Sequence, residues 1–436
     1  MRVLVVGSGG REHALCHSLT QSSLVSKVIV SPGNSGMIQT LPQLQIENIG
    51  AMDIQGLLKL ALKEKVDLTV IGPEATLSEG IVDLFKENNL LIMGPTKAAS
   101  LLETSKAFAK DVMMTNQVPT AGYAEFFEAD AALKYIEEST SQKMVVKCDG
   151  LAQGKGVIVC QSKNEARIGV ISLMKEKLLG ENINHIIIED FLEGIEVSAF
   201  ALCDGSNYAF LGTACDHKRL RDYDMGPNTG GMGVFAPASI VTAEDETWIN
   251  KNVFSPMIEG MKKAGTPFSG ILFAGLMKTM TGWKVLEFNV RLGDPETQVL
   301  LPLLDEDLLP WLEASAKGDI KKLQVELGRL SPIKKDMKAV HVVMAAHGYP
   351  GTEGEKVRSG DPINFNPTFN LTAYDFLFMA GVEKTHGQLK TKGGRVLGIT
   401  SLAETYTYAR IQAYEYVSQI EFSGAQYRND IARGQI

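Results

Sequence analysis

The chain has 436 residues, a formal net charge of −8 at neutral pH, 44% hydrophobic residues and 22% charged residues. This balance is typical of globular proteins with sizeable cores, and the length predicts roughly three domains. The negative charge and the lack of lysine or arginine blocks argue against nucleic-acid binding. No apolar run approaches the ~20 residues that span a bilayer, so we expect no membrane partner.

The N-terminus and the cysteines predict a cytoplasmic protein. The first residues, MRVLVVGSGG, enter a short apolar strand without the longer apolar stretch and cleavage site of a signal peptide. The cysteines, odd in number and without a C-x-x-C pair, are Cys16, Cys148, Cys160, Cys203 and Cys215. This pattern argues against disulfides or a zinc site and fits a reducing compartment.

Residues 1–101 alternate short apolar runs with helical stretches. The expected strands are 2–6, 27–30, 68–71 and 90–93. The expected helices are 12–20, 54–63 and 81–87. This order predicts a Rossmann-like N-terminal α/β domain with a parallel sheet, whose ligands bind beyond the carboxyl ends of the strands.

The pattern changes after residue 101. A helix over 106–114 precedes the expected strands 144–147, 157–160, 185–189 and 197–202, which predicts an α+β domain over 102–325. A helix near 308–316 leads into a charged stretch, 317–338, that we interpret as a boundary. The last domain, 326–436, is predicted to be small and β-rich, with strands 340–345 and 396–400 and a helix from 402 to about 417.

The turn Gly7-Ser8-Gly9-Gly10-Arg11-Glu12 follows the first strand. Such glycines let the backbone approach a phosphate at a helix N-terminus, so a phosphate site is one interpretation. A nicotinamide cofactor is poorly supported, because Glu12 replaces the expected small residue and no acidic residue ends the second strand. A tight structural turn is the alternative.

The segment KCDGLAQGKGV, residues 147–157, joins two short strands and carries three glycines and two lysines. A glycine-rich backbone can fold over a polyphosphate while lysines neutralise its charge. It lacks the G-K-[ST] ending of a P-loop, so the nucleotide would be held differently. A plain hairpin is the alternative, although it would need neither lysine.

Three further segments carry polar side chains at strand ends. Along Glu287-Phe288-Asn289, alternation puts Glu287 and Asn289 on one face, where two side-chain oxygens beside phosphates suit magnesium. The apolar strand ending in Glu189 could end at an adenine pocket, where backbone groups would bind the base and Glu196 the ribose hydroxyls. The polar, glycine-rich stretch from Asp216 to Gly233 is interpreted as a long binding loop. A surface hairpin or solvated charges remain the alternatives.

Together these segments resemble the phosphoribosylamine–glycine ligases, or glycinamide ribonucleotide synthetases, of the ATP-grasp superfamily. The matching segments, in the family's order, are GSGGREHAL, SPGNSG, IGPEATLSEG, SKAFAKD, KCDGLAQGKGV, DHKRLRDYDMGPNTGGMG, EFNVRLGDPETQ and GGRVLGIT. The resemblance implies a central ATP-grasp domain with a mobile lid at about 119–190. It implies ligation of glycine to 5-phosphoribosylamine with ATP, through glycyl phosphate, in purine biosynthesis.

The resemblance also implies site residues. Magnesium or manganese would bind Glu287 and Asn289. The residues expected to face ATP are Lys106, Lys147, Gly154, Lys155, Gly156, Glu189 and Glu196. Those expected to receive phosphoribosylamine are Gly9, Gly10, Asn34 and Glu74. Glycine would meet Asp216 and Arg291, and the expected catalytic groups are Arg291 and Lys155.

The chain departs from the family pattern at three positions and leaves alternatives open. Gln153 stands where a small residue is expected, and Met379 and Val382 stand where a histidine and a threonine are usual. The rival hypotheses are another ATP-grasp ligase, such as a carboxyaminoimidazole ribonucleotide synthetase, a nucleotide-linked oxidoreductase, and a non-catalytic nucleotide-binding module. The partners expected are small molecules, and a monomer is the working expectation for the oligomeric state.

Overall fold

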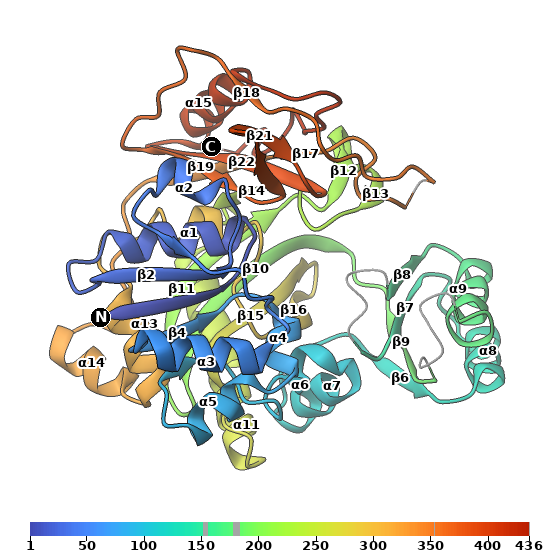
Figure 1. Ribbon diagram of the computed structural model, residues 1–436. Helices are drawn as coiled ribbons and strands as arrows, with labels where there is room; N and C mark the ends of the chain where they lie inside the picture. Colours follow the sequence, from blue (N-terminus) through green and yellow to red (C-terminus); the bar gives the residue numbers. More distant parts are fainter. Residues whose placement is uncertain (151–155, 178–183, 353, 436) are drawn as a thin grey trace.

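The computed structural model describes residues 1–150, 156–177, 184–352 and 354–435. Within these residues, sheets of five, four and eight strands form the frame. Figure 1 shows the four-stranded sheet and its two helices standing to one side of the body, while the C-terminal part of the chain lies at the top.

The five-stranded sheet is parallel, as predicted, with the order β3-β2-β1-β4-β5. Its strands are β1 (Arg2–Gly7), β2 (Lys27–Pro32), β3 (Gln45–Ile46), β4 (Leu68–Ile71) and β5 (Ile92–Met93). Residues of both faces of β1 are buried, which is why its sequence is a continuous apolar run. The two-residue β3 was not predicted because it has no apolar pattern of its own.

Short helices connect and cover these strands. They are α1 (Gly10–Thr20), α2 (Met37–Thr40), α3 (Ile54–Glu64), α4 (Glu74–Ser78) and α5 (Ile81–Glu87). The start of α3 is fixed by Asp53, whose carboxylate accepts the backbone N–H of Gly56 at 2.8 Å. Two helices then lead out of this part of the chain, α6 (Leu101–Thr104) and α7 (Lys106–Thr115).

The four-stranded sheet is antiparallel, in the order β6-β9-β7-β8. Its elements are β6 (Tyr123–Phe126), α8 (Ala129–Glu138), β7 (Met144–Cys148), β8 (Val157–Cys160), α9 (Lys163–Val170), the π-helical η1 (Ile171–Lys175) and β9 (Ile186–Asp190). Side chains such as Ile136, Val146 and Ile188 form a core of their own here. Its buried side chains are thus a cluster separate from those of the two larger sheets.

The eight-stranded sheet is antiparallel and joins the middle of the chain to its C-terminal part, in the order β16-β15-β10-β11-β14-β17-β22-β19. Its strands are β10 (Gly194–Asp204), β11 (Tyr208–Asp216), β14 (Gly233–Ala236), β15 (Ser269–Thr279), β16 (Gly282–Asn289), β17 (Lys338–Ala345), β19 (Asp375–Met379) and β22 (Arg395–Ala403). The C-terminal antiparallel strands thus confirm the predicted β-rich character.

The remaining elements surround this sheet. The helices are α10 (Ala243–Ile249), η3 (Asn250–Phe254), α11 (Ser255–Lys263), α12 (Thr297–Leu300), α13 (Leu309–Lys317), α14 (Ile320–Leu327) and α15 (Tyr406–Val417). The small pairs are β12 (Arg219–Arg221) with β13 (Met225–Asn228), joined by η2 (Asp222–Asp224), β18 (Asn364–Phe365) with β23 (Ile420–Glu421), and β20 (Val382–Thr385) with β21 (Gln388–Thr391).

Two expectations about local structure were wrong. The last helix does not begin at Leu402, which lies in β22; it begins after Thr405, whose hydroxyl accepts the N–H of Tyr408. The stretch 216–233 is not a plain loop, because the β12–β13 hairpin forms within it. The charged stretch 317–338 also contains the helix α14, with Ile320 buried.

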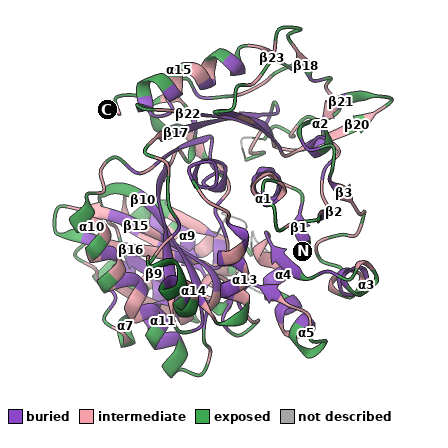
Figure 2. Cartoon of the chain, turned by 90° about the vertical axis from the view of Figure 1, so that its left-hand side faces the viewer, coloured by how far each residue is buried: buried purple, intermediate pink, exposed green. Residues whose placement is uncertain are grey.

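Apolar cores cross the expected boundaries after residues 101 and 325. Val5 of β1, Phe200 of β10, Trp311 of α13 and Phe378 of β19 belong to one buried cluster. In Figure 2 the buried colour follows the strands through the interior, and the exposed colour lies on the outer helices. We keep those boundaries as a proposal. None of the described helices is long and apolar enough to cross a membrane.

A substitution at Gly36 tests the contact between the N-terminal and C-terminal parts of the chain. A Cβ atom at Gly36 would lie 2.5 Å from Val382 Cγ2 and 2.8 Å from Met379 Cγ. Gly36→Ala should therefore destabilise the protein by about 1–3 kcal/mol through overpacking. The thermal midpoint of unfolding measures this, with Gly50→Ala as the matched control because nothing lies within 4 Å of that position. Equal midpoints for the two variants would contradict the contact.

Candidate functional site

A buried carboxylate lies between two buried lysines. Glu189, which is 3% exposed, pairs with Lys147 at 2.8 Å (Oε1–Nζ) and with Lys110 at 3.1 Å (Oε2–Nζ). Lys147 and Glu189 come from neighbouring strands, β7 and β9, while Lys110 comes from α7 and is 2% exposed. The two ammonium groups share this one carboxylate, and such buried lysines suit an anionic ligand.

Lys110 was not among the predicted site residues. Its Nζ also donates to Thr120 Oγ1 at 2.8 Å. Burial lowers the pKa of the Lys110 ammonium, with Lys147 acting in the same direction, while Glu189 favours the charged form. Lys110 could have been predicted from its spacing in the segment SKAFAKD. It lies four residues after Lys106, and side chains with this spacing share one face of a helix.

The base of the glycine-rich segment is tied to the start of α7. Asp149 accepts the backbone N–H of Ala107 at 3.2 Å and the hydroxyl of Ser105 at 3.1 Å. Lys106 Nζ donates to the Gly150 carbonyl at 3.2 Å. The carbonyl of Gly156 accepts the N–H of Cys148 at 2.8 Å, at the end of the pairing between β7 and β8. The predicted residues Gly154 and Lys155 lie outside the described residues.

Glu287 and Asn289 share one face of β16, as the alternation predicted, with Phe288 buried on the other. Burial acts to raise the pKa of Glu287, but the charges of Lys147, Lys218 and Lys106 outweigh it and lower this pKa. Among the described residues, no group of three or more His, Cys, Asp or Glu side chains could hold a metal ion. One carboxylate and one amide fit magnesium, which takes its other ligands from water and phosphates.

Lys218 and Asp216 bring the β11–β12 segment to the same site. The Lys218 ammonium forms an ion pair with Glu196 of β10. Desolvation disfavours the charged form, but Glu196 and Asp216 outweigh it and raise the Lys218 pKa. Burial, with Glu296 nearby, raises the pKa of Asp216 well above its usual range. Lys218 was missed as a site residue, although it lies in the quoted segment DHKR.

Asp216 also has an unsatisfied oxygen. Its Oδ1 atom is buried without a hydrogen-bond partner among the described residues. A narrow recess lies beside it and is lined in part by Glu196, Ser198 and Lys218. Buried polar atoms are nearly always paired, so an unpaired carboxylate oxygen here is suited to receive a donor from a ligand.

Arg291 joins the end of β16 to the N-terminal part of the chain. Its Nε donates to Glu74 at 2.9 Å, and its Nη2 lies 3.2 Å from Glu103. Glu103 also accepts the N–H of Val290 at 2.8 Å. Desolvation disfavours the charged guanidinium, but Glu103 and Glu74 outweigh it and raise the Arg291 pKa. Glu103 had not been predicted.

The first glycine turn is filled by a side chain of the chain itself. The Glu12 carboxylate accepts the N–H of Gly9 at 2.6 Å and the Nε–H of Arg11 at 2.6 Å. A Cβ atom at Gly7 or Gly72 would come within 2.5 or 1.8 Å of Glu12. Glycine is therefore needed at 7 and 72 to make room for Glu12, and the N–H of Gly9 is already bound to an anion.

The other predicted residues of this region are also engaged. Asn34 donates to the carbonyls of Ser8 at 2.7 Å and Met379 at 3.2 Å, and it accepts the N–H of Gly36 at 3.0 Å. A Cβ at Gly10 would lie 2.6 Å from Gln298 Nε2. These contacts fix the mouth of the N-terminal sheet against the C-terminal part.

Arg395 of β22 reaches the site from the C-terminal part and was not predicted. Its Nη1 donates to the carbonyls of Gly230 at 2.6 Å and Asp294 at 2.7 Å. Its Nη2 lies 3.1 Å from Asp294 Oδ2. Desolvation opposes the charge, while Asp294 and nearby acidic groups raise the Arg395 pKa.

The sheets and the lysine-lined site define an ATP-grasp protein. Residues 104–297 match the model described as Phosphoribosylglycinamide synthetase, ATP-grasp (A) domain. Residues 1–103 match the N domain of the same family, and residues 339–434 match its C domain. The chain belongs to the phosphoribosylglycinamide synthetase family.

Individual proteins agree with this assignment. The chain is 42% identical over 436 residues to a phosphoribosylamine–glycine ligase of Caldanaerobacter subterraneus subsp. tengcongensis, covering 100% of both. The crystal structure of that ligase from Thermotoga maritima matches with a TM-score of 0.83 and 33% identity, over 99% of this chain and 100% of the other. A biotin carboxylase domain from Hydrogenobacter thermophilus, crystallised with MgADP, shares the fold with a TM-score of 0.73 and 16% identity, over 98% and 91%.

Lys110 allows a test of the lysine cluster. Lys110→Met removes a charged hydrogen-bond partner of Glu189, an interaction worth about 1.5–3 kcal/mol. We expect the Kd for ATP, measured by calorimetric titration, to rise about tenfold or more. The matched control is Lys134→Met, because Lys134 is 74% exposed and pairs with Glu138 of its own helix. An unchanged Kd in Lys110→Met would contradict a role for the cluster in nucleotide binding.

Proposed function

We propose that this chain ligates glycine to 5-phosphoribosylamine at the expense of ATP, giving glycinamide ribonucleotide, ADP and phosphate in purine biosynthesis. Membership of the family over nearly the whole chain supports this function. The carrying observation in the site is the approach of lysines to the Glu287 end of β16. Lys147 Nζ donates to the carbonyl of the preceding residue, Leu286, at 3.3 Å, and the charges of Lys147, Lys218 and Lys106 lower the pKa of Glu287.

The first step activates glycine. A carboxylate oxygen of glycine attacks the γ-phosphorus of ATP, the bond from that phosphorus to the β–γ bridging oxygen breaks, and ADP leaves. Phosphoryl transfer depends mainly on positioning and charge neutralisation, which the lysines supply. In our assignment Lys106, Lys147, Lys155 and the backbone of Gly154 and Gly156 face the phosphates.

The second step forms the amide. The amine of phosphoribosylamine attacks the carbonyl carbon of glycyl phosphate, phosphate leaves with the bridging oxygen, and the amine loses a proton. Arg291 is assigned to the glycine end, beside Asp216. Because Arg291 is bound to Glu74, it also connects this end to the N-terminal turns, Gly9, Gly10 and Asn34, to which we assign phosphoribosylamine.

The remaining assignments concern the metal and the nucleoside. Glu287 and Asn289 would hold Mg²⁺, or Mn²⁺, which when bound neutralises phosphate charge. Glu196 is assigned to the ribose and Glu189 to the adenine end, although the pairing of Glu189 with two lysines also suits it to orient them. We expect small-molecule partners only, a monomer, and a cytoplasmic location.

Closure of the four-stranded unit would protect the intermediate. Glycyl phosphate hydrolyses in water, so the reaction needs water to be excluded. The unit at about 119–190 has its own core and stands apart from the body, which fits a lid that moves as one piece.

ADP release by the purified protein tests the function. With MgATP, glycine and freshly generated phosphoribosylamine, release should require all three, and glycinamide ribonucleotide should be found by mass spectrometry. Full ADP release with glycine omitted, or no product with all components present, would contradict the assignment.

Glu287→Gln tests the metal assignment. The change keeps the shape of the side chain but removes the charge that metal and lysines share, so we expect kcat to fall at least about a hundredfold. Steady-state ADP release measures this over a range of magnesium concentrations. Glu138→Gln serves as the control, because Glu138 is 69% exposed on α8. Full activity of Glu287→Gln at low magnesium would refute the assignment.

A further inference from the structure

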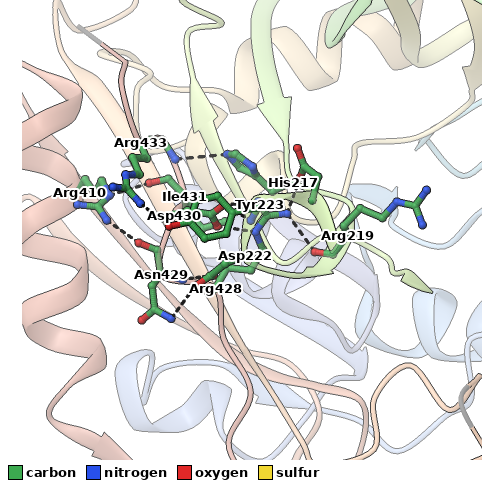
Figure 3. A network of polar contacts seen from close by, with 12 residues as sticks. His217, Arg219, Asp222, Tyr223, Arg410, Arg428, Asn429, Asp430, Ile431 and Arg433 are labelled. Atoms are coloured by element: carbon green, nitrogen blue, oxygen red, sulfur yellow. Dashed lines mark hydrogen bonds and ion pairs between the residues drawn. The ribbon is translucent and has the colours of Figure 1, made fainter. Parts of the chain in front are cut away.

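The C-terminal tail, residues 428–433, lies against the β12–β13 hairpin, which is over 200 positions away in sequence. Figure 3 shows residues of the two segments in contact, with Asp430 beside Tyr223 and Asn429 bonded to Asp222. The hairpin extends from the end of β11 and carries Lys218 at its root. The proposed reaction does not account for this network.

Contacts at the tip of the hairpin centre on Arg428, which is 1% exposed. Its Nη1 pairs with Asp224 Oδ1 at 2.7 Å. Its Nε and Nη2 donate to the two carboxylate oxygens of Asp430 at 2.7 and 2.8 Å. Asp430 Oδ2 also accepts the backbone N–H of Tyr223 at 2.8 Å. The bidentate pair of Arg428 with Asp430 lies within the tail and orients both side chains. The tail holds the turn through the Arg428–Asp224 ion pair and the hydrogen bond from Tyr223 to Asp430.

The turn needs such support. Tyr223 and Asp224 are consecutive non-glycine residues with φ of 58° and 54°, in the left-handed region that L-residues disfavour. Asn429 adds two hydrogen bonds to Asp222, from its backbone N at 2.7 Å and its Nδ2 at 3.1 Å. The guanidinium of Arg433 lies over the Tyr223 ring at 5.9 Å.

Contacts at the root of the hairpin lie on both sides of Lys218. The N–H of Ala432 donates to His217 Nε2 at 3.3 Å. Arg428 Nη1 donates to the carbonyl of Arg219 at 3.2 Å. The side chain of Lys218, between these two residues, turns to the other side and pairs with Glu196 of β10. The alternation of an extended chain produces this arrangement.

We propose that the C-terminal tail is a positioning device for Lys218, and that Arg428 is its principal positioning residue. The inference rests on the proposed function and adds to it that Lys218, which lines one recess together with Asp216, acts on the transferring phosphoryl group. With the tail in place, the residues on both sides of Lys218 are bonded to it, which fixes the backbone from which the Lys218 side chain extends toward Glu196. Without it, the ammonium group is no longer fixed at the site, while Lys106, Lys147 and Glu189 stay in place.

The experiment compares Arg428→Met with Arg428→Lys in the full chain. Misplacement of a reacting group by about 1 Å can cost on the order of a hundredfold. We expect kcat to fall tenfold to a hundredfold in Arg428→Met, with the KM for MgATP changed less than about threefold, and partial recovery in Arg428→Lys. The control is Arg358→Met, which removes a C-terminal arginine that pairs with Asp361 away from the hairpin. An unchanged kcat in folded Arg428→Met would overturn the proposal.

A milder variant guards against unfolding. Asp222→Ala removes only the exposed contacts to Asn429, and we expect it to lower kcat in the same direction while hydrogen exchange quickens at residues 219–229 alone. In the double variant of Lys218→Met with Asp222→Ala, the second change should have no further effect on kcat. Additive effects would overturn the proposal. The unaltered chain is assayed in the same experiment. If it does not ligate glycine, the proposed function is wrong; if it does, the variants test the role of the tail alone.

Discussion

The binding of Arg291 between Glu74 and Glu103 is the constraint on which the site depends. An arginine this deeply placed is stable only when its charge is matched, and its two partners come from α4 and α6 rather than from its own strand. The pair therefore fixes the end of β16 against the N-terminal part. Glu287 and Asn289 lie at the end of β16, just before Arg291, so the contacts of Arg291 also fix where these two side chains lie.

The turn after Arg291 extends this constraint to the C-terminal part. Asp294 binds Arg395 of β22, and Gln298 lies against Gly10. The N-terminal part, the middle and the C-terminal part of the chain thus meet at the turn that follows β16. The eight-stranded sheet joins the middle and the C-terminal part, because it contains strands of both. The four-stranded unit, by contrast, carries Lys147 and Glu189 on a separate core. In our account chemistry occurs where this separable unit meets the fixed one.

Local patterns in the sequence were enough to predict some of these features. The apolar runs of β1, β2 and β4 predicted the parallel sheet, and period-two alternation predicted that Glu287 and Asn289 share a face. Leu402 was misplaced because apolar residues continue from β22 toward α15; Thr405, a favourable N-cap residue, was the usable signal.

Long-range ion pairs could not be predicted in the same way. Lys110 with Glu189, Arg395 with Asp294 and Arg428 with Asp224 join residues from distant parts of the chain, so spacing in the sequence contains no trace of them. The glycine turn shows the opposite problem. Its pattern suggests a phosphate, whereas the structure puts the Glu12 carboxylate at the N–H of Gly9, which also weakens the case for a dinucleotide cofactor.

The central claim is that the site activates a carboxylate as an acyl phosphate, and one isotope measurement tests it most directly. Glycine labelled with ¹⁸O in its carboxylate would be supplied with ATP and phosphoribosylamine, and the released phosphate analysed by mass spectrometry. The account predicts that each phosphate carries one ¹⁸O atom, transferred from glycine. Phosphate without ¹⁸O, formed together with glycinamide ribonucleotide, would contradict it.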